Sequence, residues 1–194
     1  MSSHNNIINN IIVSNNYYGI YLYSATNNNI LNSTLELSRG LGAYISGSNN
    51  NNFLENFVRN NAGEAAIDVV LSNNNIFNSN TISNNSAKGV SIRNSNYSAL
   101  YNNNINTNNS DGIALGYSNY TTLLNNSINF NKNRGISSVS SGGGTFTANN
   151  MEGNRYNFEV SGNLDSDYEN DIDTSNTVED KPVYYLKNIT NQTY

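Results

Sequence analysis

Apolar residues recur along this chain at a fixed interval, in short groups separated by asparagine, serine and glycine. One column of this repeat holds glycine or alanine, and an apolar residue follows each of its members. Successive members lie 23 or 24 residues apart: Gly19, Gly42, Ala66, Gly89, Gly112 and Gly135. A period of this length is typical of a solenoid, in which each repeat forms one coil.

Two further columns of the repeat contain only apolar residues. The first consists of Ile7, Ile30, Phe53, Phe77, Leu100, Leu123 and Phe146. The second, five residues later, consists of Ile12, Leu35, Val58, Ile82, Ile105, Ile128 and Met151. β-Branched and aromatic residues favour strands, and the groups are too short for helices. A unit of three short strands without a long connection buries its apolar residues only by coiling. The pattern therefore predicts a parallel β-helix, in which each strand pairs with its equivalent one coil away.

Asparagine accounts for 47 of the 194 residues, a bias that is also found in disordered low-complexity chains. Here many of the asparagines have fixed places, three residues after each apolar column. The first such column starts at Asn10 and Ser33 and continues with Asn56, Asn80, Asn103, Asn126 and Asn149. The second starts at Asn15 and Ser38 and continues with Asn61, Asn85, Asn108, Asn131 and Asn154. Asparagine tolerates the left-handed backbone of a sharp corner, and stacked amides hydrogen-bond to one another. We interpret both columns as structural ladders at corners of the coil.

The repeat resembles a known family. The phrases Gly-Ile-x-Leu and apolar-x-Asn-Asn-x-Ile-x-x-Asn, both complete between Gly112 and Asn131, are similar to the repeat of NosD-like and pectin-lyase-like proteins. The stretch from Ile172 to Leu186 is similar to the segment that closes such modules in exported archaeal surface proteins. The resemblance implies a right-handed parallel β-helix of about seven regular coils. We expect a solenoid over residues 1–162 and an acidic segment over 163–194 that continues or caps it.

The composition excludes several classes of function. Charged residues make up 12% of the chain, the net charge is -5, and there is no cysteine and one histidine. An acidic chain does not suit nucleic acid, and no apolar run is long enough to span a membrane. Copper handling, which the NosD resemblance implies, is not expected, because the soft ligands that copper favours are lacking. We expect an extracellular or cell-surface protein, whose export signal was removed or lies outside this sequence.

Carboxylates in the solenoid do not converge in the sequence pattern. No two acids share a column in adjacent coils, and Glu64 and Asp68 are the closest pair along the chain. A glycoside hydrolase needs two carboxylates at a fixed short separation. The charges instead predict ladders of opposite sign, with Lys88, Asp111 and Arg134 in one column and Glu36 opposite Arg59 in another. We therefore expect no catalytic residues and no enzyme, with a polysaccharide-acting lyase, hydrolase or epimerase as the alternative.

The negative charge lies in the closing segment, where acids alternate with other residues. These acids are Asp165, Asp167, Glu169, Asp171 and Asp173. In an extended chain all five side chains point to one side, and Ca²⁺ with its oxygen ligands would relieve their repulsion. Calcium is thus the one ion considered, and no other cofactor is expected. The alternative is a polar edge that prevents strand pairing with other chains.

Tyrosine is the other distinctive residue type, with 14 copies and no tryptophan. Tyr97 and Tyr120 share a column in adjacent coils, and Tyr101 and Tyr117 are near them in the sequence. Exposed aromatic rings on a rigid sheet stack on sugar rings, which makes these four residues candidate carbohydrate contacts. The alternative is that tyrosine simply suits the surface of a strand.

Three functions follow from these observations. The first is a non-catalytic module of an exported or cell-surface protein, acting as a rigid scaffold, an adhesin or a carbohydrate-contacting surface. Its partners would be glycans or cell-envelope components. The second is the polysaccharide-acting enzyme. The third is a self-assembling filament or envelope protein with end-to-end self-association, because the first coil lacks an evident cap.

Overall fold

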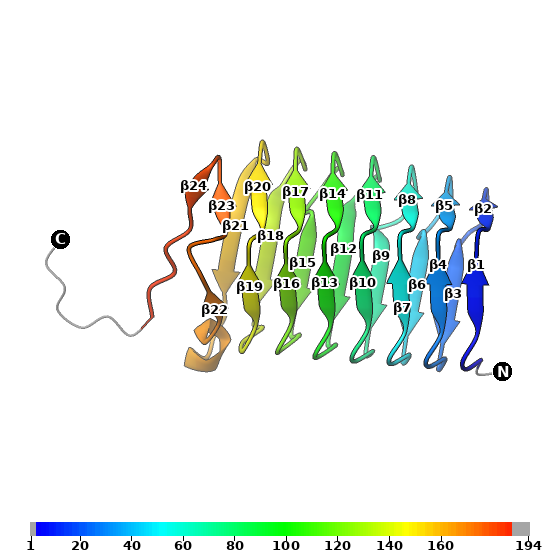
Figure 1. The fold of residues 1–194 in the computed structure, drawn as a ribbon, viewed down its shortest axis with the longest axis horizontal. Helices are drawn as coiled ribbons and strands as arrows, with labels where there is room; N and C mark the ends of the chain where they lie inside the picture. Colours follow the sequence, from blue (N-terminus) through cyan, green and yellow to red (C-terminus); the bar gives the residue numbers. More distant parts are fainter. Residues whose placement is uncertain (1–2, 188–194) are drawn as a thin grey trace, which may run out of the picture.

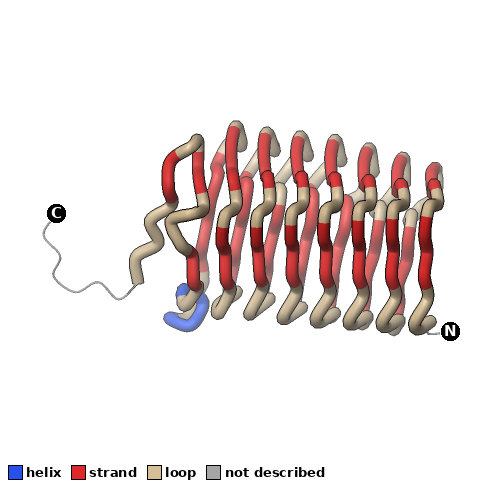
Figure 2. The backbone as a smooth tube through the Cα atoms, viewed as in Figure 1, coloured by secondary structure: helices blue, strands red, loops and turns tan. Residues whose placement is uncertain are grey.

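A computed structural model of the chain describes residues 3–187. The chain winds as a right-handed parallel β-helix, which confirms the predicted fold class (Figure 1). Each regular coil contributes one strand to each of three sheets, and short turns connect the strands (Figure 2). The sheets run the length of the solenoid, so that residues about 23 apart in sequence lie side by side.

Sheets A and B hold the short strands of each coil. Sheet A contains β1 (Ile7–Asn9), β4 (Asn29–Leu31), β7 (Asn52–Leu54), β10 (Ile76–Asn78), β13 (Ala99–Tyr101), β16 (Thr122–Leu124), β19 (Thr145–Thr147) and β22 (Asp171–Ile172). Sheet B contains β2 (Ile12–Ser14), β5 (Thr34–Glu36), β8 (Phe57–Arg59), β11 (Thr81–Ser83), β14 (Asn104–Asn106), β17 (Ser127–Asn129), β20 (Asn150–Glu152), β23 (Thr177–Val178) and β24 (Lys181–Pro182). The middle residue of most of these three-residue strands points inward, and Phe53 and Phe77 stack in the core with ring centroids 5.2 Å apart.

Sheet C holds the longer strands. It contains β3 (Ile20–Tyr23), β6 (Ala43–Ser46), β9 (Ala65–Val70), β12 (Lys88–Arg93), β15 (Ile113–Gly116), β18 (Arg134–Val139) and β21 (Tyr156–Ser161). The predicted glycine column lies at the start of these strands, where the coils approach closely. A β-carbon on Gly112 would lie 2.8 Å from the carbonyl oxygen of Gly135 in the next coil. The close approach explains why the column holds only glycine and one alanine.

The first coil is one residue shorter than predicted. Ile8 pairs with Ile30 and Val13 with Leu35, a separation of 22 residues, whereas the predicted members Ile7 and Ile12 are 69% and 75% exposed. The prediction for these two positions was wrong because a slip of one residue turns a strand's side chains to the opposite face. For the same reason the ladder position in this coil holds Ile11, not Asn10.

Both predicted ladders form and are buried from Ser33 and Ser38 onward, whereas the predicted first members, Asn10 and Asn15, are exposed. Asn103 shows the bonding that its equivalents repeat. Its backbone N–H and its Nδ2 donate to Oδ1 of Asn126 at 3.0 and 2.9 Å, and Nδ2 also donates to the carbonyl of Phe77 at 2.9 Å. Its own Oδ1 accepts from the backbone and the amide of Asn80, both at 3.0 Å. The amide of Asn103 is therefore satisfied only by the coils on either side of it.

The prediction placed the left-handed backbone conformation at the ladder asparagines. In the structure the residue before each ladder asparagine adopts this conformation instead. Glu55 and Ala148, which precede members of the first ladder, have φ of 56° and 53°. Thr107 and Phe130, which precede members of the second, have φ of 52° and 55°. Residue types with no preference for this conformation are thus held in it by their neighbours. The ladder selects asparagine for its amide rather than for its backbone.

The third corner carries a serine ladder and an asparagine ladder. The backbone N–H of Ser48 donates to Oγ of Ser72 at 2.9 Å, and that of Ser72 donates to Oγ of Ser95 at 3.0 Å. A further asparagine ladder, absent from the predictions, runs beside it through Asn28, Asn51 and Asn75. Its signal in the sequence is brief, because serine and threonine replace asparagine in the following coils.

The acidic closing segment both continues the solenoid and ends it. Strands β22 and β23 extend sheets A and B, and β24 pairs antiparallel with β23, so that the parallel order stops there. A short 3₁₀ helix, η1 (Asp165–Tyr168), precedes β22 and covers one corner of the last coil (Figure 2). Residues 188–194 of the predicted segment lie outside the described part of the chain.

Replacing a ladder asparagine should destabilise the fold strongly. In Asn103→Ala the amide and backbone N–H of Asn80 and the carbonyl of Phe77 lose buried partners, which is expected to cost about 2–4 kcal/mol. Asn104→Ala, at the exposed neighbouring position, should change stability by less than about 0.5 kcal/mol. Urea unfolding of both variants tests this, and similar midpoints would contradict it.

The glycine column offers a second matched pair. Gly112→Ala places a methyl group against Ile128 and the next coil's backbone, and we expect a loss of about 1–3 kcal/mol in the free energy of unfolding. Gly116, in the same coil, has nothing within 4 Å of an added β-carbon, so Gly116→Ala should be neutral or slightly stabilising. Thermal unfolding separates the two. A stable Gly112→Ala variant would show that the coils are farther apart than described.

Candidate functional site

The outer face of sheet C carries the most varied chemistry of the solenoid. Its strands pair in register, so one outward-facing residue of each coil lies in a single row parallel to the long axis. We call this the central row; it consists of Tyr21, Tyr44, Asp68, Ser91, Ala114, Ser137 and Glu159. The inward-facing residues on either side of it belong to the core. Along the row the side chains change from aromatic to acidic to small.

The row begins in a cluster of tyrosines in the first two coils. Tyr21 and Tyr44 stack with centroids 5.3 Å apart and planes 6° from parallel. Tyr18 lies against both at 5.5 Å, while Tyr17 and Tyr23 extend the cluster at its edges. Burial, reinforced by the neighbouring tyrosines, raises the pKa of the Tyr18 hydroxyl. This hydroxyl therefore stays protonated at neutral pH and is available as a hydrogen-bond donor.

The next position in the row is an acid held by an arginine. Asp68 is 1% exposed, and Arg93 from the next coil donates to it through Nε at 3.3 Å and Nη2 at 2.6 Å. Glu64 lies 3.5 Å from the same guanidinium. The hydrogen bond to Asp68 raises the pKa of Arg93 further above its ordinary value. The structure thus brings Glu64 and Asp68 together through one cation, an arrangement that the column pattern did not predict.

Beyond the ion pairs the row forms a shallow trough. Ser91, Ala114 and Ser137 make its floor, and a cavity of about 220 Å³ lies above them. Lys88 and Arg93 line this cavity, and within residues 3–187 the Lys88 ammonium makes no ion pair. Asp111 lines it as well, so the trough is a small-residue channel with charged side chains of both signs beside it.

The predicted charge ladders form in part. Glu36 and Arg59 pair at 2.8 Å, and Asp111 lies 3.9 Å from Arg134, as predicted. The predicted pairing of Lys88 with Asp111 was wrong. Asp111 instead accepts hydrogen bonds from Asn133 at 2.6 Å and from the backbone N–H of Arg134 at 3.0 Å.

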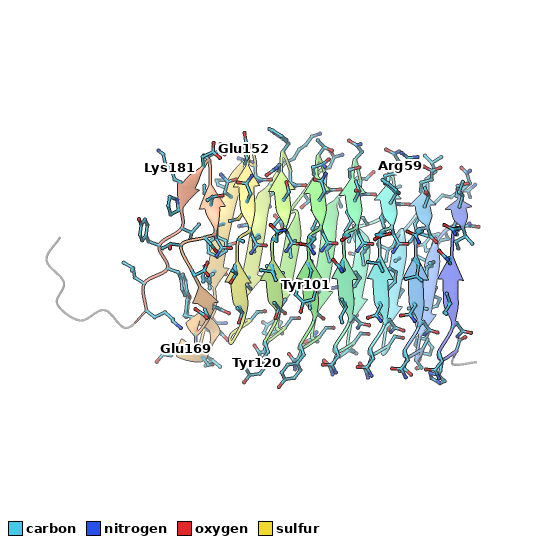
Figure 3. The ribbon with its side chains drawn as sticks, viewed as in Figure 1. Arg59, Tyr101, Tyr120, Glu152, Glu169 and Lys181 are labelled. Atoms are coloured by element: carbon cyan, nitrogen blue, oxygen red, sulfur yellow. The ribbon has the colours of Figure 1, made fainter. Side chains whose placement is uncertain are left out.

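The four tyrosines predicted to contact carbohydrate do not form one surface. Tyr97 and Tyr120 stack at 5.0 Å at the corner between sheets C and A, and the other face of the Tyr120 ring lies against Gly143. Tyr101 lies on sheet A, on another face of the solenoid from Tyr120 (Figure 3). Tyr117 is 63% exposed and makes no ring contact within the described chain. The rings of Tyr97 and Tyr120 stack on each other, whereas the ring of Tyr117 is exposed to solvent.

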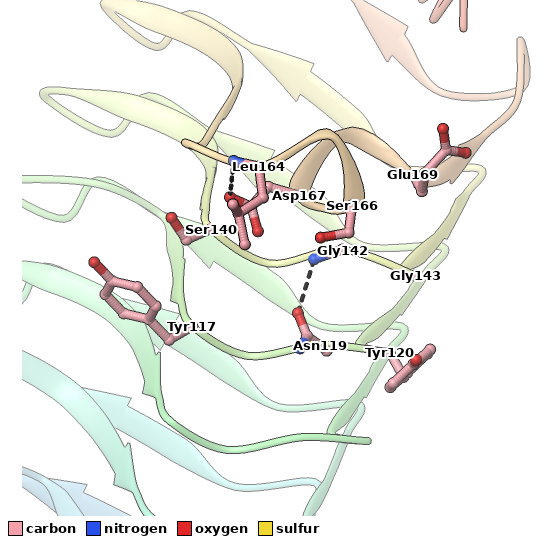
Figure 4. A pocket seen from close by; sticks show the side chains of 10 residues that line it. All are labelled: Tyr117, Asn119, Tyr120, Ser140, Gly142, Gly143, Leu164, Ser166, Asp167 and Glu169. Atoms are coloured by element: carbon pink, nitrogen blue, oxygen red, sulfur yellow. Dashed lines mark hydrogen bonds between the residues drawn. The ribbon is translucent and has the colours of Figure 1, made fainter. Parts of the chain in front are cut away.

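Tyr117 and Tyr120 border a cavity of about 440 Å³, which we call the corner pocket (Figure 4). Two successive turns and helix η1 form its walls. Its lining consists of Tyr117, Asn119, Tyr120, Ser140, Gly142, Gly143, Leu164, Ser166, Asp167 and Glu169. Two of the tyrosines predicted to contact carbohydrate therefore line the same pocket as two of the acids predicted to bind a metal ion, Asp167 and Glu169. The sequence pattern carries no signal for this meeting, because the closing segment leaves the repeat.

The five acids of the closing segment do not line one edge, and the prediction that they do was wrong. Helix η1 breaks the extended conformation, and Asp167 turns inward to accept the backbone N–H groups of Asn163 and Leu164 at 2.9 and 3.0 Å. Asp173 instead hydrogen-bonds to Ser175. Asp165, Glu169 and Asp171 are exposed. Over residues 3–187 no three acidic, histidine or cysteine side chains gather as a metal site.

The fold is a right-handed parallel β-solenoid that exposes the central row along the outer face of sheet C. The chain belongs to the right-handed β-helix family, whose model, described as a right handed beta helix region, matches residues 1–151 and 60–177. No curated protein matches the sequence significantly. No helix among the described residues is long and apolar enough to cross a membrane.

Several solved structures share the fold. Pectate lyase Pel9A has a TM-score of 0.70 and 16% identity, over 89% of this chain and 52% of that chain. The periplasmic alginate epimerase AlgG has a TM-score of 0.64 and 15% identity, over 89% and 43%. The A-module of the mannuronan C-5 epimerase AlgE6 from Azotobacter vinelandii has a TM-score of 0.64 and 15% identity, over 88% and 52%. At such identities the likeness shows the fold alone. The chain spans about half the length of these structures.

The buried ion pair on sheet C should be worth more than an exposed pair. Arg93→Met leaves the Asp68 carboxylate buried without its cation, and we expect a loss of about 1–3 kcal/mol. Adding Asp68→Asn should recover most of that loss. Arg59→Met, which breaks the exposed pair with Glu36, should cost less than about 1 kcal/mol. Urea unfolding measures all three, and an additive double variant would contradict the coupling.

Proposed function

We propose that this protein is a non-catalytic carbohydrate-binding module that binds a polysaccharide chain lengthwise along sheet C. The observation that carries the proposal is the continuity of the central row. It joins an aromatic cluster, an ion-paired acid and a trough lined by small and charged side chains, Lys88 among them, on one rigid face. These are the groups that contact the apolar faces, the hydroxyls and the charged substituents of sugars.

The geometry of the solenoid suits a linear polymer. Neighbouring strands lie about 4.8 Å apart, so the central row presents one contact position per coil at a regular step. The seven strands of sheet C give the row seven positions in line. A compact ligand would use few of them, whereas an extended chain of sugar residues uses them in succession. Because the coils are locked to one another, the row loses little conformational entropy when a chain binds.

The solved structures with the same fold support a polysaccharide as the ligand. Their names describe a pectate lyase and two alginate or mannuronan epimerases. In this chain Lys88 and Arg93 would attract carboxylate substituents, and Ser91 and Ser137 would hydrogen-bond to hydroxyl groups. The tyrosines would hold sugar rings, because tyrosine offers an apolar face beside a polar hydroxyl. We propose that the module acts outside the cell, where such polymers occur.

Binding without turnover fits the protonation of the groups on this face. A glycosidase uses one protonated and one ionised carboxylic acid, and proton abstraction from a sugar needs a base with a pKa near neutrality. Here Glu64 and Asp68 share the guanidinium of Arg93. The pKa values of Arg93 and Tyr18 are both raised, which disfavours either residue as a base. A lyase or epimerase stays the second candidate, because Lys88 lies in the trough and has no ion-pair partner among the described residues.

Titration of soluble polysaccharides by calorimetry tests this proposal. Tyr44→Ala and Lys88→Ala should each weaken binding by about tenfold, because each removes one stacking or one charged contact worth about 1–2 kcal/mol. The control is Arg59→Ala, which alters the exposed surface of sheet B and should bind as the wild type does.

Two results would count against the proposal. Equal affinities for the wild type and both sheet C variants would remove the central row as the binding site. Release of shortened or epimerised product by the wild type, lost in Lys88→Ala, would replace a binding module with an enzyme.

A further inference from the structure

The corner pocket differs from sheet C in both place and charge. It lies where the chain turns from sheet C to sheet A, beneath helix η1, and Tyr120 and Glu169 lie along the same edge of the solenoid (Figure 3). Its volume of about 440 Å³ falls within the usual range for small-molecule sites. The closing segment supplies one wall, so the pocket is not a regular feature of every coil.

Two buried polar groups in the wall have unused hydrogen-bonding capacity. Ser140 is 9% exposed, and its Oγ makes no hydrogen bond within residues 3–187. Asp167 is 8% exposed, and both backbone N–H groups that it accepts bind Oδ2. Among the described residues Oδ1 of Asp167 accepts nothing. Both atoms are open to the pocket, so a polar ligand can hydrogen-bond to Ser140 Oγ and donate a hydrogen bond to Oδ1 of Asp167.

The rim supplies an aromatic surface. Tyr117 and Tyr120 lie on either side of Asn119, with Ser140 above Tyr117 and with Asp167 on helix η1 (Figure 4). The positions next to Tyr117 in its ladder are Asn94 and Ser140, whose side chains are too short to cover its ring. The amide oxygen of Asn119 accepts the N–H of Gly142 at 2.9 Å, which leaves its Nδ2 as a donor toward the pocket.

The charge of the pocket selects among sugars. Asp167 and Glu169 both line it, and the one described cation near them is Lys187, 3.7 Å from Glu169. No described cation pairs with Asp167. A uronate would be repelled here, whereas a protonated amine would meet a buried carboxylate and an open aromatic ring, both of which attract cations. The trough on sheet C differs, because Lys88 and Arg93 line it together with Asp111.

We propose that the corner pocket binds an amino sugar with a free, protonated amine. The sugar ring lies on Tyr117, the ammonium group donates to Oδ1 of Asp167, and Ser140 and Asn119 hydrogen-bond to its hydroxyls. The site is independent of polysaccharide binding on sheet C and uses none of its residues. A module with both sites would hold two chemically different glycans at once.

The test uses a glucosamine trimer, its fully N-acetylated counterpart and an oligogalacturonate, titrated into the full chain by calorimetry. We expect the glucosamine trimer to bind at least about tenfold more tightly than the acetylated trimer, since acetylation removes the charge. The affinity should fall with added salt, and the oligogalacturonate should not compete. Equal binding of the two trimers would overturn the proposal.

Variants locate the site. Tyr117→Ala and Glu169→Gln should each weaken binding of the glucosamine trimer several-fold, and Asp167→Asn should abolish the preference for the free amine. Asp167 also accepts hydrogen bonds from two backbone N–H groups, so the melting temperature of Asp167→Asn is measured in parallel. If this variant melts at a lower temperature than the wild type, the proposal is tested with Tyr117→Ala and Glu169→Gln. The control is Tyr101→Ala, on sheet A and outside the pocket.

The two proposals fail separately. Lys88→Ala lies in the sheet C trough and should leave binding of the glucosamine trimer unchanged. Loss of trimer binding in Lys88→Ala, with Tyr117→Ala unaffected, would place the amino sugar on sheet C and overturn the pocket proposal. Polysaccharide binding that depends on Tyr44 would still stand in that case.

Discussion

The structure depends on the hydrogen bonds between the side-chain amides of successive coils. A ladder asparagine such as Asn103 gives both of its donors and its acceptor to neighbouring coils, and no water reaches it. In a three-sided solenoid the backbone groups at each corner point away from the strand ladders and need other partners. The asparagine amide supplies them in both directions along the axis. A single coil cannot satisfy these groups, which is why the repeat is stable only as a stack.

This constraint divides the residues of each coil into two classes. Inward-facing positions and corners serve the stack, and they account for the repetition in the sequence. Outward-facing positions are free of it, and there the coils differ: the central row of sheet C changes from tyrosine at Tyr21 to an acid at Asp68 and to serine at Ser137. In such a protein we therefore expect functional residues at outward-facing positions, where the residue type does not repeat from coil to coil. The corner pocket follows the same rule, since helix η1 interrupts the coil that would otherwise fill the corner.

The sequence predicts the stack well because the stack imposes its own period. The columns around Phe53, Asn103 and Gly112 lie where they were predicted. The prediction fails where a coil departs from 23 residues, as at Ile7 and Ile12, because the register of strand pairing then decides which face is buried. The prediction also assigns the left-handed backbone conformation to the wrong residue. Even Phe130 adopts this conformation, because it precedes a hydrogen-bonded ladder asparagine. Side-chain contacts between coils, such as that of Arg93 with Asp68, depend on the length and direction of the side chains. Aligning columns in the sequence does not predict these properties.

Charge links the two candidate sites to the same architecture. The core and ladders are neutral, so no buried charge is needed for stacking, and charged side chains remain for the surface. On sheet C Arg93 pairs with Glu64 and Asp68, Arg134 pairs with Asp111 and Glu159, and the Lys88 ammonium lies beside them in the trough, so charges of both signs meet on this face. At the corner pocket the excess is negative, because helix η1 turns Asp167 inward with only backbone N–H groups to stabilise it. A long rigid scaffold keeps these two potentials apart, since at physiological ionic strength screening separates charges beyond roughly 8 Å. The charges of one site therefore have little effect on ligand binding at the other.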